Sequence, residues 1–404
     1  MEQVLKSFVP AWVQVVSVVY TRGAMETQDV LGEEALALHR EHHGKLSIES
    51  SVPLLDRHDL SLAYTPGVAR VSSIIGKNAE LAREYTIKRN TVAVVSDGSA
   101  ILGLGNLGPY AALPVMEGKA ALFKKFAGVD AFPICLATQD VDAIVETVER
   151  IAPAFGGINL EDISAPRCFE VEERLQKALD IPVVHDDQHG TAVVVLAGLL
   201  NALRVRGLNK ESVRIVVNGA GAAGTAISKL LLEYGFTHLT VCDSKGIIHD
   251  DRDDLGPYKK ELARRTAPRE RGGLADAVRN ADLFIGVSKG GLLTEELIRS
   301  MRPDPIVFAL ANPIPEVMPD LAKSAGASIV ATGRSDFPNQ ANNVLAFPGL
   351  FRGALDHGVR HITDAMFIAA AEALAQAVPH PDSEHILPSV FDAGVTERVA
   401  SAIR

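Results

Sequence analysis

Two pairs of adjacent carboxylates stand at the ends of apolar segments, and their chemistry is the easiest to state. Glu161 and Asp162 follow "GGINL", and Asp186 and Asp187 follow "IPVV" and His185. Neighbouring anions repel each other, and a carboxylate near a dry interior loses hydration, so such pairs usually need a compensating cation. Hard oxygen ligands of this kind suit Mg²⁺ or Mn²⁺. Solvated acids at strand ends are the alternative, and spacing alone does not choose between the two.

The segment between the two pairs decides whether the carboxylates can converge. "EVEERLQKAL" has helical apolar spacing, so the order is strand, acid pair, helix, strand, acid pair. Consecutive parallel strands of a right-handed βαβ unit end on the same edge of the sheet. We therefore expect both pairs at neighbouring carboxyl ends, where α/β proteins build their sites. His185 and His189 do not indicate zinc, because no cysteine or HExxH motif accompanies them.

A glycine-rich stretch further along the chain predicts a dinucleotide site. In "VRIVVNGAGAAGTAISKLLLEYG" the glycines lie between a predicted strand and an uninterrupted helix, and the next strand, "LTVCD", ends at Asp243. Such glycines let the backbone approach a pyrophosphate at the helix N-terminus, and the acid can bind ribose hydroxyls. A tight turn in a nucleotide-free domain is the alternative. The residues predicted to bind the cofactor here are Gly219, Ala220, Gly221, Ala222, Ala223, Gly224, Asp243, Ser244 and Lys245.

The choice between NAD and NADP depends on the end of the second strand. Asp243 favours NAD, because a 2′-phosphate would place two anions in contact. Lys245 follows closely and could neutralise that phosphate if its side chain turns inward. We expect NAD to be slightly preferred, with dual use possible.

The first glycine pattern along the chain, "LGLGNLG", precedes the second pattern at Gly219–Gly224 and lacks this context. Pro109 and Pro114 follow Gly103, Gly105 and Gly108 and would spoil an immediate long helix. No strand-end acid stands about 20 residues later. We expect a packed turn that could line the cofactor cleft from the opposite side.

Two further residues could move protons. Tyr64 stands beside the turn signal "TPG". Lys119 lies in "PVMEGKAALFKKFAG", an otherwise apolar segment with helical spacing. Considered alone, such a tyrosine is usually a core or surface residue, and such a lysine is usually solvated.

These residues must be positioned by an α/β fold. The strand candidates are "TVAVVS", "FPICLA", "GGINL", "IPVV", "VRIVVN", "LTVCD", "LFIGVS", "PIVFALAN" and "SIVATG". Helical segments alternate with them, which predicts parallel sheets covered on both faces. Residues 30–90 are predicted to be mostly helical, and "DAMFIAAAEALAQAV" predicts a helix near the C-terminus. We expect an N-terminal α/β catalytic domain over residues 1–187 and a Rossmann-type doubly wound domain with C-terminal helices over residues 188–404.

Composition excludes several classes of protein. The chain has 404 residues and a net charge of −10 with no basic tract, which argues against nucleic acid as a partner. Its three cysteines form no CxxC and imply no disulfide framework, so a cytoplasmic location is expected. The apolar run 192–203 is far shorter than the roughly 20 residues that a bilayer requires and predicts a buried helix. The N-terminal segment "FVPAWVQVVSVVY" loosely resembles the core of a signal peptide, but Pro10 and Gln14 interrupt it and no clean cleavage site follows. Residues 1–24 could be an optional extension before Met25.

Seven segments together resemble the short bacterial malic enzymes, collinearly over roughly residues 40–400. They are "LAYTPGVA", "SDGSAILGLGNLGPYAALPVMEGKAALFK", "NLEDI", "HDDQHGTAVV", "NGAGAAG", "FALANPIPE" and "NNVLAFPG". The resemblance implies a homodimer that oxidises (S)-malate with NAD or NADP and a divalent metal, Mg²⁺ or Mn²⁺, and releases CO₂ to give pyruvate.

The resemblance also implies residue roles. Tyr64 would be the general acid and Lys119 the general base. Glu161, Asp162 and Asp187 would hold the metal. Asp186 would be a catalytic residue that faces malate or supports the metal ligands. Asn312 and Asn343 would contact the substrate or the nicotinamide end of the cofactor.

One position departs from the family pattern. Larger malic enzymes carry an arginine just before "ILGLG" that can clamp a substrate carboxylate, whereas this chain has Ala100 preceded by Ser99. The group that holds the second carboxylate of malate is therefore not assigned.

The chemistry is coherent with these residues. A lysine can act as a base only if its pKa falls, which burial and a nearby metal would cause. A malolactic-type reaction and 2-hydroxy-acid oxidation without decarboxylation are the alternative activities. A catalytically inactive, nucleotide-responsive regulator is an alternative of another class; it would be favoured by loss of Tyr64, Lys119 or a metal acid, and all of these are present.

Overall fold

The computed structural model describes residues 30–266, 268 and 270–404, in two compact units divided between Glu49 and Ser50. In the first unit, residues 30–42 are helical. The optional extension 1–24 and the apolar segment within it lie outside the described residues. The second unit, Ser50–Arg404, contains both sheets and every predicted site residue.

The second unit begins with short helices, which confirms the helical prediction for this region. None of the residues in α2 or α3 is buried. The elements are α2 (Arg57–Ala63), α3 (Gly67–Ile75), η1 (Ala79–Leu81), α4 (Ala82–Tyr85) and η2 (Ile87–Asn90).

The first sheet has four parallel strands in the order β2-β1-β3-β4. Leu160 pairs with His185, so the next residues, Glu161 and Asp186, leave neighbouring strands side by side. The predicted order of strand, acid pair, helix, strand and acid pair is confirmed. The elements are β1 (Thr91–Ser96), β2 (Asp130–Cys135), α6 (Val141–Ile151), η3 (Ala152–Ala154), β3 (Gly157–Leu160), α7 (Arg167–Ala178) and β4 (Val183–His185).

The prediction that two prolines would prevent a long helix after the first glycine pattern is wrong. Helix α5 (Pro109–Ala127) has 19 residues and begins at Pro109 itself. Proline suits the first helical position, because the N–H that it lacks has no intrahelical partner there. Pro114 lies early in the helix and removes one backbone hydrogen bond, after which the helix continues to Ala127.

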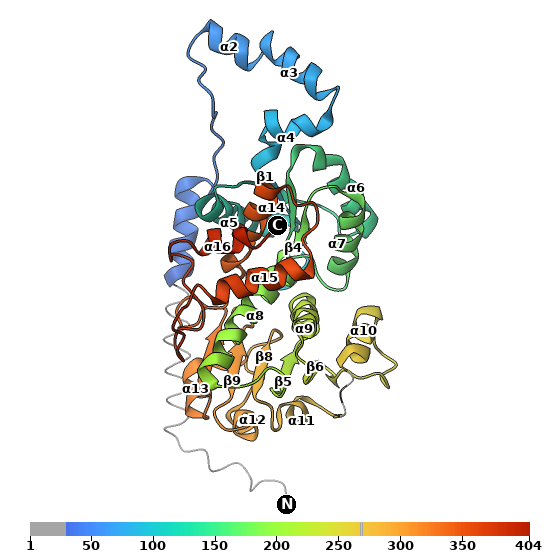
Figure 1. Ribbon diagram of the computed structural model, residues 1–404, viewed down its shortest axis with the longest axis vertical. Helices are drawn as coiled ribbons and strands as arrows, with labels where there is room; N and C mark the ends of the chain where they lie inside the picture. Colours follow the sequence, from blue (N-terminus) through green and yellow to red (C-terminus); the bar gives the residue numbers. More distant parts are fainter. Residues whose placement is uncertain (1–29, 267, 269) are drawn as a thin grey trace, which may run out of the picture. The chain divides into compact units, whose positions relative to one another are not determined.

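The second sheet has six strands in the order β10-β9-β8-β5-β6-β7, and only β7 runs antiparallel to its neighbour (Figure 1). Counted within this sheet, the order is 6-5-4-1-2-3, which is that of a Rossmann domain. All nine predicted strand segments are present, and β7 was too short for its pattern to be seen. The strands are β5 (Ile215–Asn218), β6 (Leu239–Asp243), β7 (Gly246–Ile247), β8 (Leu283–Gly286), β9 (Ile306–Ala309) and β10 (Ile329–Thr332).

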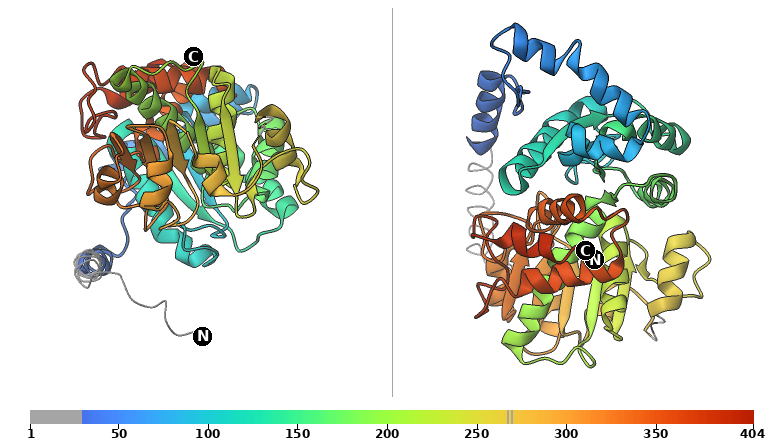
Figure 2. Two further views of the ribbon diagram at one scale, coloured as in Figure 1. Left: turned by 90° about the horizontal axis from the view of Figure 1, so that it is seen from below. Right: turned by 45° about the horizontal axis from the view of Figure 1, so that its top comes forward.

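Helix α8 (Asp186–Arg206) connects the two sheets. It starts directly after β4, and most of its residues are buried because it packs against α9 (Ala222–Tyr234) and α15 (Asp364–Ala375) (Figure 1, Figure 2). The predicted buried helix over 192–203 is therefore confirmed. Among the described residues, no helix is long and apolar enough to cross a membrane. The other helices are α10 (Pro257–Thr266), α11 (Leu274–Val278), α12 (Glu295–Ser300), α13 (Pro319–Ser324), η4 (Asn343–Leu345), α14 (Phe347–His357) and α16 (Val395–Ser401).

The C-terminal helices complete the core near the first sheet. Phe347 and Phe351 of α14 pack edge-on against Phe123 of α5, with ring centroids 4.7 and 5.4 Å away. One continuous buried cluster contains side chains from β1, α5, α8, α14 and the second sheet. The two sheets therefore share a hydrophobic core.

Candidate functional site

Lys119 lies between the two acid pairs. Its Nζ donates to Glu161 Oε1 at 2.6 Å and also to Asp186 Oδ2. The side chain is only 6% exposed, and Nζ lies 4.4 Å from the centroid of the Phe347 ring. Helix α5 and the ends of β3 and β4 thus bring together a buried ammonium and two buried carboxylates.

Asp162 and Asp187, the other two acids, are joined by a hydrogen bond from a backbone N–H to a carboxylate. The N–H of Asp162 donates to Asp187 Oδ2 at 2.9 Å. Asp162 has φ 54°, a left-handed conformation that is uncommon for a residue other than glycine. Asp162 Oδ2 and Asp186 Oδ1 are buried and have no hydrogen-bond partner among the described residues.

Burial and mutual repulsion raise the pKa values of Asp162, Asp186 and Glu161. Burial raises the pKa of Asp162 to about 7, and the nearby charge of Asp187 adds to the rise. Burial also raises the pKa of Asp186 to about 6, against the opposing effect of Lys119. The pKa of Glu161 is likewise raised well above its ordinary value by burial. One lysine therefore does not compensate the negative charge of this cluster.

The pKa of Lys119 differs from the sequence expectation. Burial lowers the pKa of the ammonium, but the charges of Asp186, Glu161 and Asp187 outweigh this effect and raise the pKa above its ordinary value. Lys119 stays protonated for as long as these carboxylates are not neutralised.

The acid cluster fits a divalent cation by its chemistry. It offers only oxygen ligands, two of its buried oxygens lack hydrogen-bond partners, and the carboxyls of Asp162 and Asp186 have raised pKa values. The oxygens of Glu161, Asp162 and Asp187 do not meet at one point, however. Glu161 binds Lys119 and, through Oε2, the amide of Asn159 at 3.0 Å, while Asp187 turns to the backbone of Asp162.

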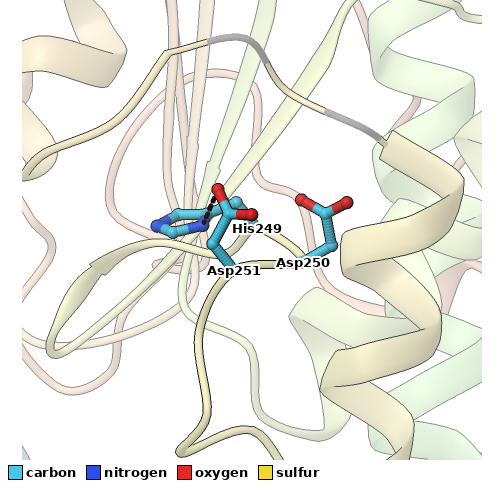
Figure 3. Close-up of side chains that lie close together, drawn as sticks. All are labelled: His249, Asp250 and Asp251. Carbon is cyan, nitrogen blue, oxygen red and sulfur yellow. Dashed lines mark ion pairs between the residues drawn. The ribbon is translucent and has the colours of Figure 1, made fainter.

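In the part of the chain that the structure describes, three possible metal ligands lie within 4.8 Å of one another only at His249, Asp250 and Asp251 (Figure 3). Both aspartates are exposed, and Arg271 already binds Asp251 at 2.7 Å and approaches Asp250 at 3.7 Å. Their charge is thus compensated without an ion.

The second glycine pattern has the geometry of a dinucleotide fingerprint. Gly219 begins the turn after β5 with φ 121°, and a Cβ there would lie 2.6 Å from the carbonyl oxygen of Val287. A Cβ on Gly224 would lie 1.7 Å from the carbonyl oxygen of Gly219. Helix α9 begins beside this close backbone contact, with Gly221 as its N-cap. Its N-terminus is therefore placed to face a pyrophosphate.

Residues 188–404 match the family described as the malic enzyme NAD binding domain, and residues 43–176 match the malic enzyme N-terminal domain. The chain belongs to the malic enzyme family. It therefore has the two-domain α/β architecture that the sequence predicts, with a nucleotide-binding Rossmann domain that takes NAD or NADP.

Relatives within the malic enzyme family cover nearly the whole chain. The bifunctional malic/malolactic enzyme of Bacillus subtilis (strain 168) is 56% identical over 377 residues, or 92% of this chain and 92% of that protein. The NADP-dependent malic enzyme of Halomonas elongata is 49% identical over 379 residues, or 89% of each chain. The crystal structure of the NAD-dependent malic enzyme of Thermotoga maritima has a TM-score of 0.89 and 51% identity, and the match covers 91% of this chain and 98% of that one.

Tyr64, the tyrosine of the malic enzyme motif "LAYTPGVA", is not brought to Lys119. It is the C-cap of α2, and its side chain is 67% exposed. Within the described residues, no hydrogen bond joins its hydroxyl to Lys119 or to the carboxylates. The structure of one chain therefore assembles the lysine and the acids but leaves the predicted general acid at the surface.

The two predicted asparagines lie beside different segments, Asn312 beside the first glycine pattern and Asn343 beside the start of α8. Asn312 follows β9, and its carbonyl oxygen would lie 2.3 Å from a Cβ on Gly103. The first glycine pattern therefore touches the Rossmann domain at Gly103, but residues 102–107 are exposed, so the predicted packed turn is only partly packed. Asn343 begins η4 beside α8, since a Cβ on Gly190 would lie 3.2 Å from its Cβ and 1.9 Å from Asp186 Oδ1.

One buried residue that sequence reasoning missed positions the start of α8. Glu172 of α7 accepts from the N–H of His185 at 2.7 Å and from Gln188 Nε2 at 2.9 Å, and His189 Nε2 lies 3.1 Å from it. These contacts fix the turn that carries Asp186. The signal was a charged residue on the buried side of "EVEERLQKAL", and it accounts for His189 without zinc. Both ring nitrogens of His185 are buried and have no hydrogen-bond partner among the described residues.

Proposed function

We propose that this chain catalyses the oxidative decarboxylation of (S)-malate to pyruvate and CO₂ with reduction of NAD or NADP. The observation that carries this proposal is the placement of Lys119 within hydrogen-bond distance of Glu161 and Asp186, beside carboxylate oxygens that lack partners. The names of the relatives support the same activity. The direct test is a steady-state assay with malate, Mn²⁺, and NAD or NADP in parallel, in which pyruvate and reduced cofactor should form together.

The backbone at Gly219–Gly224 would hold the cofactor, which would supply the hydride acceptor for C2 of malate. A Mg²⁺ or Mn²⁺ ion held by Glu161, Asp162 and Asp187 would supply positive charge for the substrate oxygens and for the carboxylates around Lys119. With those carboxylates compensated, the pKa of Lys119 falls through burial, and the lysine can accept the hydroxyl proton of malate.

The other residues hold the substrate and deliver the last proton. Asp186 fixes the ammonium of Lys119 by an ion pair. Asn312 and Asn343 orient malate and the nicotinamide end. Tyr64 then protonates C3 of enolpyruvate and recovers its proton through Lys119.

Mn²⁺ affinity is expected to depend on pH through the raised carboxyl pKa values. Below about 7 for Asp162 and about 6 for Asp186 the carboxyls bind protons that an ion must displace. Affinity should therefore fall as the pH drops through these values, by roughly tenfold per pH unit for each proton released. Isothermal titration in buffers of different ionisation enthalpy measures both the affinity and the protons released. Binding that is independent of pH would contradict the assignment.

A homodimer would complete the site. A cluster of large exposed apolar side chains marks a surface that contacts another protein. They are concentrated near α2, α3 and the first glycine pattern: Leu54, Leu55, Leu60, Leu62, Leu104 and Tyr110. We infer that a second copy covers this surface and that Tyr64 of one copy reaches Lys119 of the other.

Mixing two inactive variants tests this arrangement. If Tyr64→Phe and Lys119→Ala chains are dissociated and reassociated at random, half of the dimers carry one of each, and each of these has one intact shared site. About a quarter of wild-type activity should return. The two variants mixed without dissociation serve as the control. No recovery in dimers that have demonstrably exchanged would show that both residues act within one chain.

A malolactic-type activity is a second candidate, because one relative is named a bifunctional malic/malolactic enzyme. Product analysis separates the two activities: lactate without net cofactor reduction indicates the malolactic reaction.

Two assignments accompany this function. We propose that the catalytic domain spans residues 1–187 and the nucleotide-binding domain residues 188–404. We also propose a cytoplasmic location, since Cys135, Cys168 and Cys242 are free thiols, which fits a reducing compartment.

A further inference from the structure

Glu316, in the loop after β9, is a fully buried carboxylate to which the proposed mechanism gives no role. Its Oε1 accepts from the N–H of Ser288 at 2.9 Å, and its Oε2 accepts from the N–H of Ala311 at 3.0 Å. Within the described part of the chain, no basic side chain forms an ion pair with it. Burial raises the pKa of Glu316, and these backbone N–H groups oppose the rise. The carboxylate is thus held by the backbone of two loops instead of by a cation.

The two loops follow neighbouring strands, and Glu316 lies where these strands stop pairing. The register of β8 and β9 ends at Gly286 and Ala309 (Figure 1), and one further bond runs from the N–H of Leu310 to the carbonyl oxygen of Gly286. A Cβ on Gly286 would lie 2.3 Å from the carboxyl carbon of Glu316, so the glycine makes room for the carboxyl group. The carboxylate therefore replaces the sheet contacts and sets the spacing between the two loops.

Each loop leads to a different part of the proposed site. Ser288 lies against the dinucleotide turn, because a Cβ on Gly219 would be 3.2 Å from its Cβ, and its Oγ accepts from Asn218 Nδ2 at 2.9 Å. Ala311 directly precedes Asn312, which the proposed function places at malate and the nicotinamide end. One carboxylate thus connects the turn that would hold the pyrophosphate with the asparagine at the reacting groups.

We propose that Glu316 is a positioning residue that acts through Asn312 and sets the geometry of hydride transfer between malate and the nicotinamide. Its two oxygens satisfy one N–H from each loop, and only a carboxylate offers two such acceptors. Glutamine would accept from one N–H and direct its own NH₂ group at the other. The inference rests on the proposed function insofar as Asn312 must orient the reacting groups. The competing interpretation is that Glu316 only stabilises the two loops.

Single-turnover kinetics separate these interpretations, because the rate constant of hydride transfer does not depend on the fraction of folded enzyme. Enzyme in excess, with Mn²⁺ and malate, reduces a limiting amount of NAD or NADP, which is followed by absorbance. Malate deuterated at C2 identifies the hydride step. Isothermal titration with ADP-ribose, which has the pyrophosphate but no nicotinamide, reports on the dinucleotide turn alone.

The variants are Glu316→Gln, Asn312→Ala and the two combined. Glu316→Asp, which keeps both oxygens on a side chain one carbon shorter, is the second variant if the glutamine protein does not fold. The matched control is Val317→Ala, which removes buried apolar volume from the same loop and leaves the carboxylate in place. Thermal unfolding compares the stability of all variants.

Glu316→Gln should lower the rate constant of hydride transfer roughly 10–100-fold, since a displacement of about 1 Å at the reacting groups can cost 10²-fold. ADP-ribose affinity should stay unchanged. In the Asn312→Ala background, Glu316→Gln should cause no further loss, because it acts through that asparagine. Val317→Ala should lower the melting temperature and keep the rate constant of the wild type.

Two results would overturn the positioning role and leave the proposed function standing. One is a wild-type rate constant in the Glu316 variant, and the other is a loss that adds in full to that of Asn312→Ala. A wild type that does not reduce either cofactor with malate would instead refute the proposed function, and this inference with it.

Discussion

Replacing Asp187 by asparagine should reduce malate turnover by roughly 10³-fold or more, because a metal ion supplies several kcal/mol of stabilisation to the reacting oxygens. Asparagine has almost the same shape, and its Oδ1 can still accept the hydrogen bond from the N–H of Asp162. The change therefore removes charge and metal affinity while it preserves the local backbone contact. Asp187→Ala removes both and should be inactive as well. The measurements are kcat/KM with malate and Mn²⁺, and Mn²⁺ affinity by titration.

The control for this experiment is Asp180→Ala. Asp180 is also an acid near β4, but it is exposed and pairs with Arg360 at the surface. Its loss should change neither turnover nor Mn²⁺ affinity. An Asp187→Asn enzyme with normal turnover, or a wild type that is fully active in excess EDTA, would rule out the metal assignment.

Separating the two half-reactions should distinguish Lys119 from Tyr64. Lys119→Ala is expected to impair both the reduction of oxaloacetate and the protonation of enolpyruvate, since the lysine serves the alcohol and recharges the tyrosine. Tyr64→Phe is expected to reduce oxaloacetate nearly as fast as the wild type, but to protonate enolpyruvate about 10²–10⁴-fold more slowly, which is the usual contribution of a general acid. Oxaloacetate reduction is followed by cofactor absorbance, and protonation by incorporation of solvent deuterium into pyruvate.

The lysine variant needs its own control, because it leaves several buried carboxylates without their cation. Thermal unfolding shows whether the fold persists, and added primary amines should restore part of the activity if only the ammonium is missing. If Tyr64→Phe reduced oxaloacetate as slowly as Lys119→Ala does, the two roles would be wrongly assigned.

The sequence predicted the sheets and the helix after the second glycine turn, α9, but missed the helix after the first glycine turn. Nine strand segments were visible because buried parallel strands are short apolar runs bounded by turn residues. Strand β7 has only two residues and no pattern to detect. Helix α5 was missed because its prolines were interpreted as helix breakers, whereas Pro109 occupies the one turn in which proline costs no hydrogen bond.

Residues that act through long-range contacts could not be predicted from local pattern. The acid pairs converge because adjacent strands place them, which the order of elements already indicated. In the structure Arg252 and Lys259 form ion pairs with Asp243, and nothing in the sequence connects these residues, because ion pairs across a loop and a helix leave no periodic signal. The sequence showed that the arginine of the larger malic enzymes is absent at Ala100, but it did not show which residue takes its place. An arginine that lies near in space is Arg167, at the start of α7, which binds Asp97 at 3.2 Å.

The packing of α14 against α5 bears on when the site can form as the chain is synthesised. Lys119 lies over the ring of Phe347, and Phe347 and Phe351 both pack against Phe123. Phe347 and Phe351 leave the ribosome long after α5 and β1 to β4. Helix α14 packs in turn on α16, at the very end of the chain. Contacts over such sequence distances form late, since a long loop must close before they are gained. The side of α5 that α14 covers therefore stays exposed until translation is almost complete, and until then this apolar surface is open to aggregation.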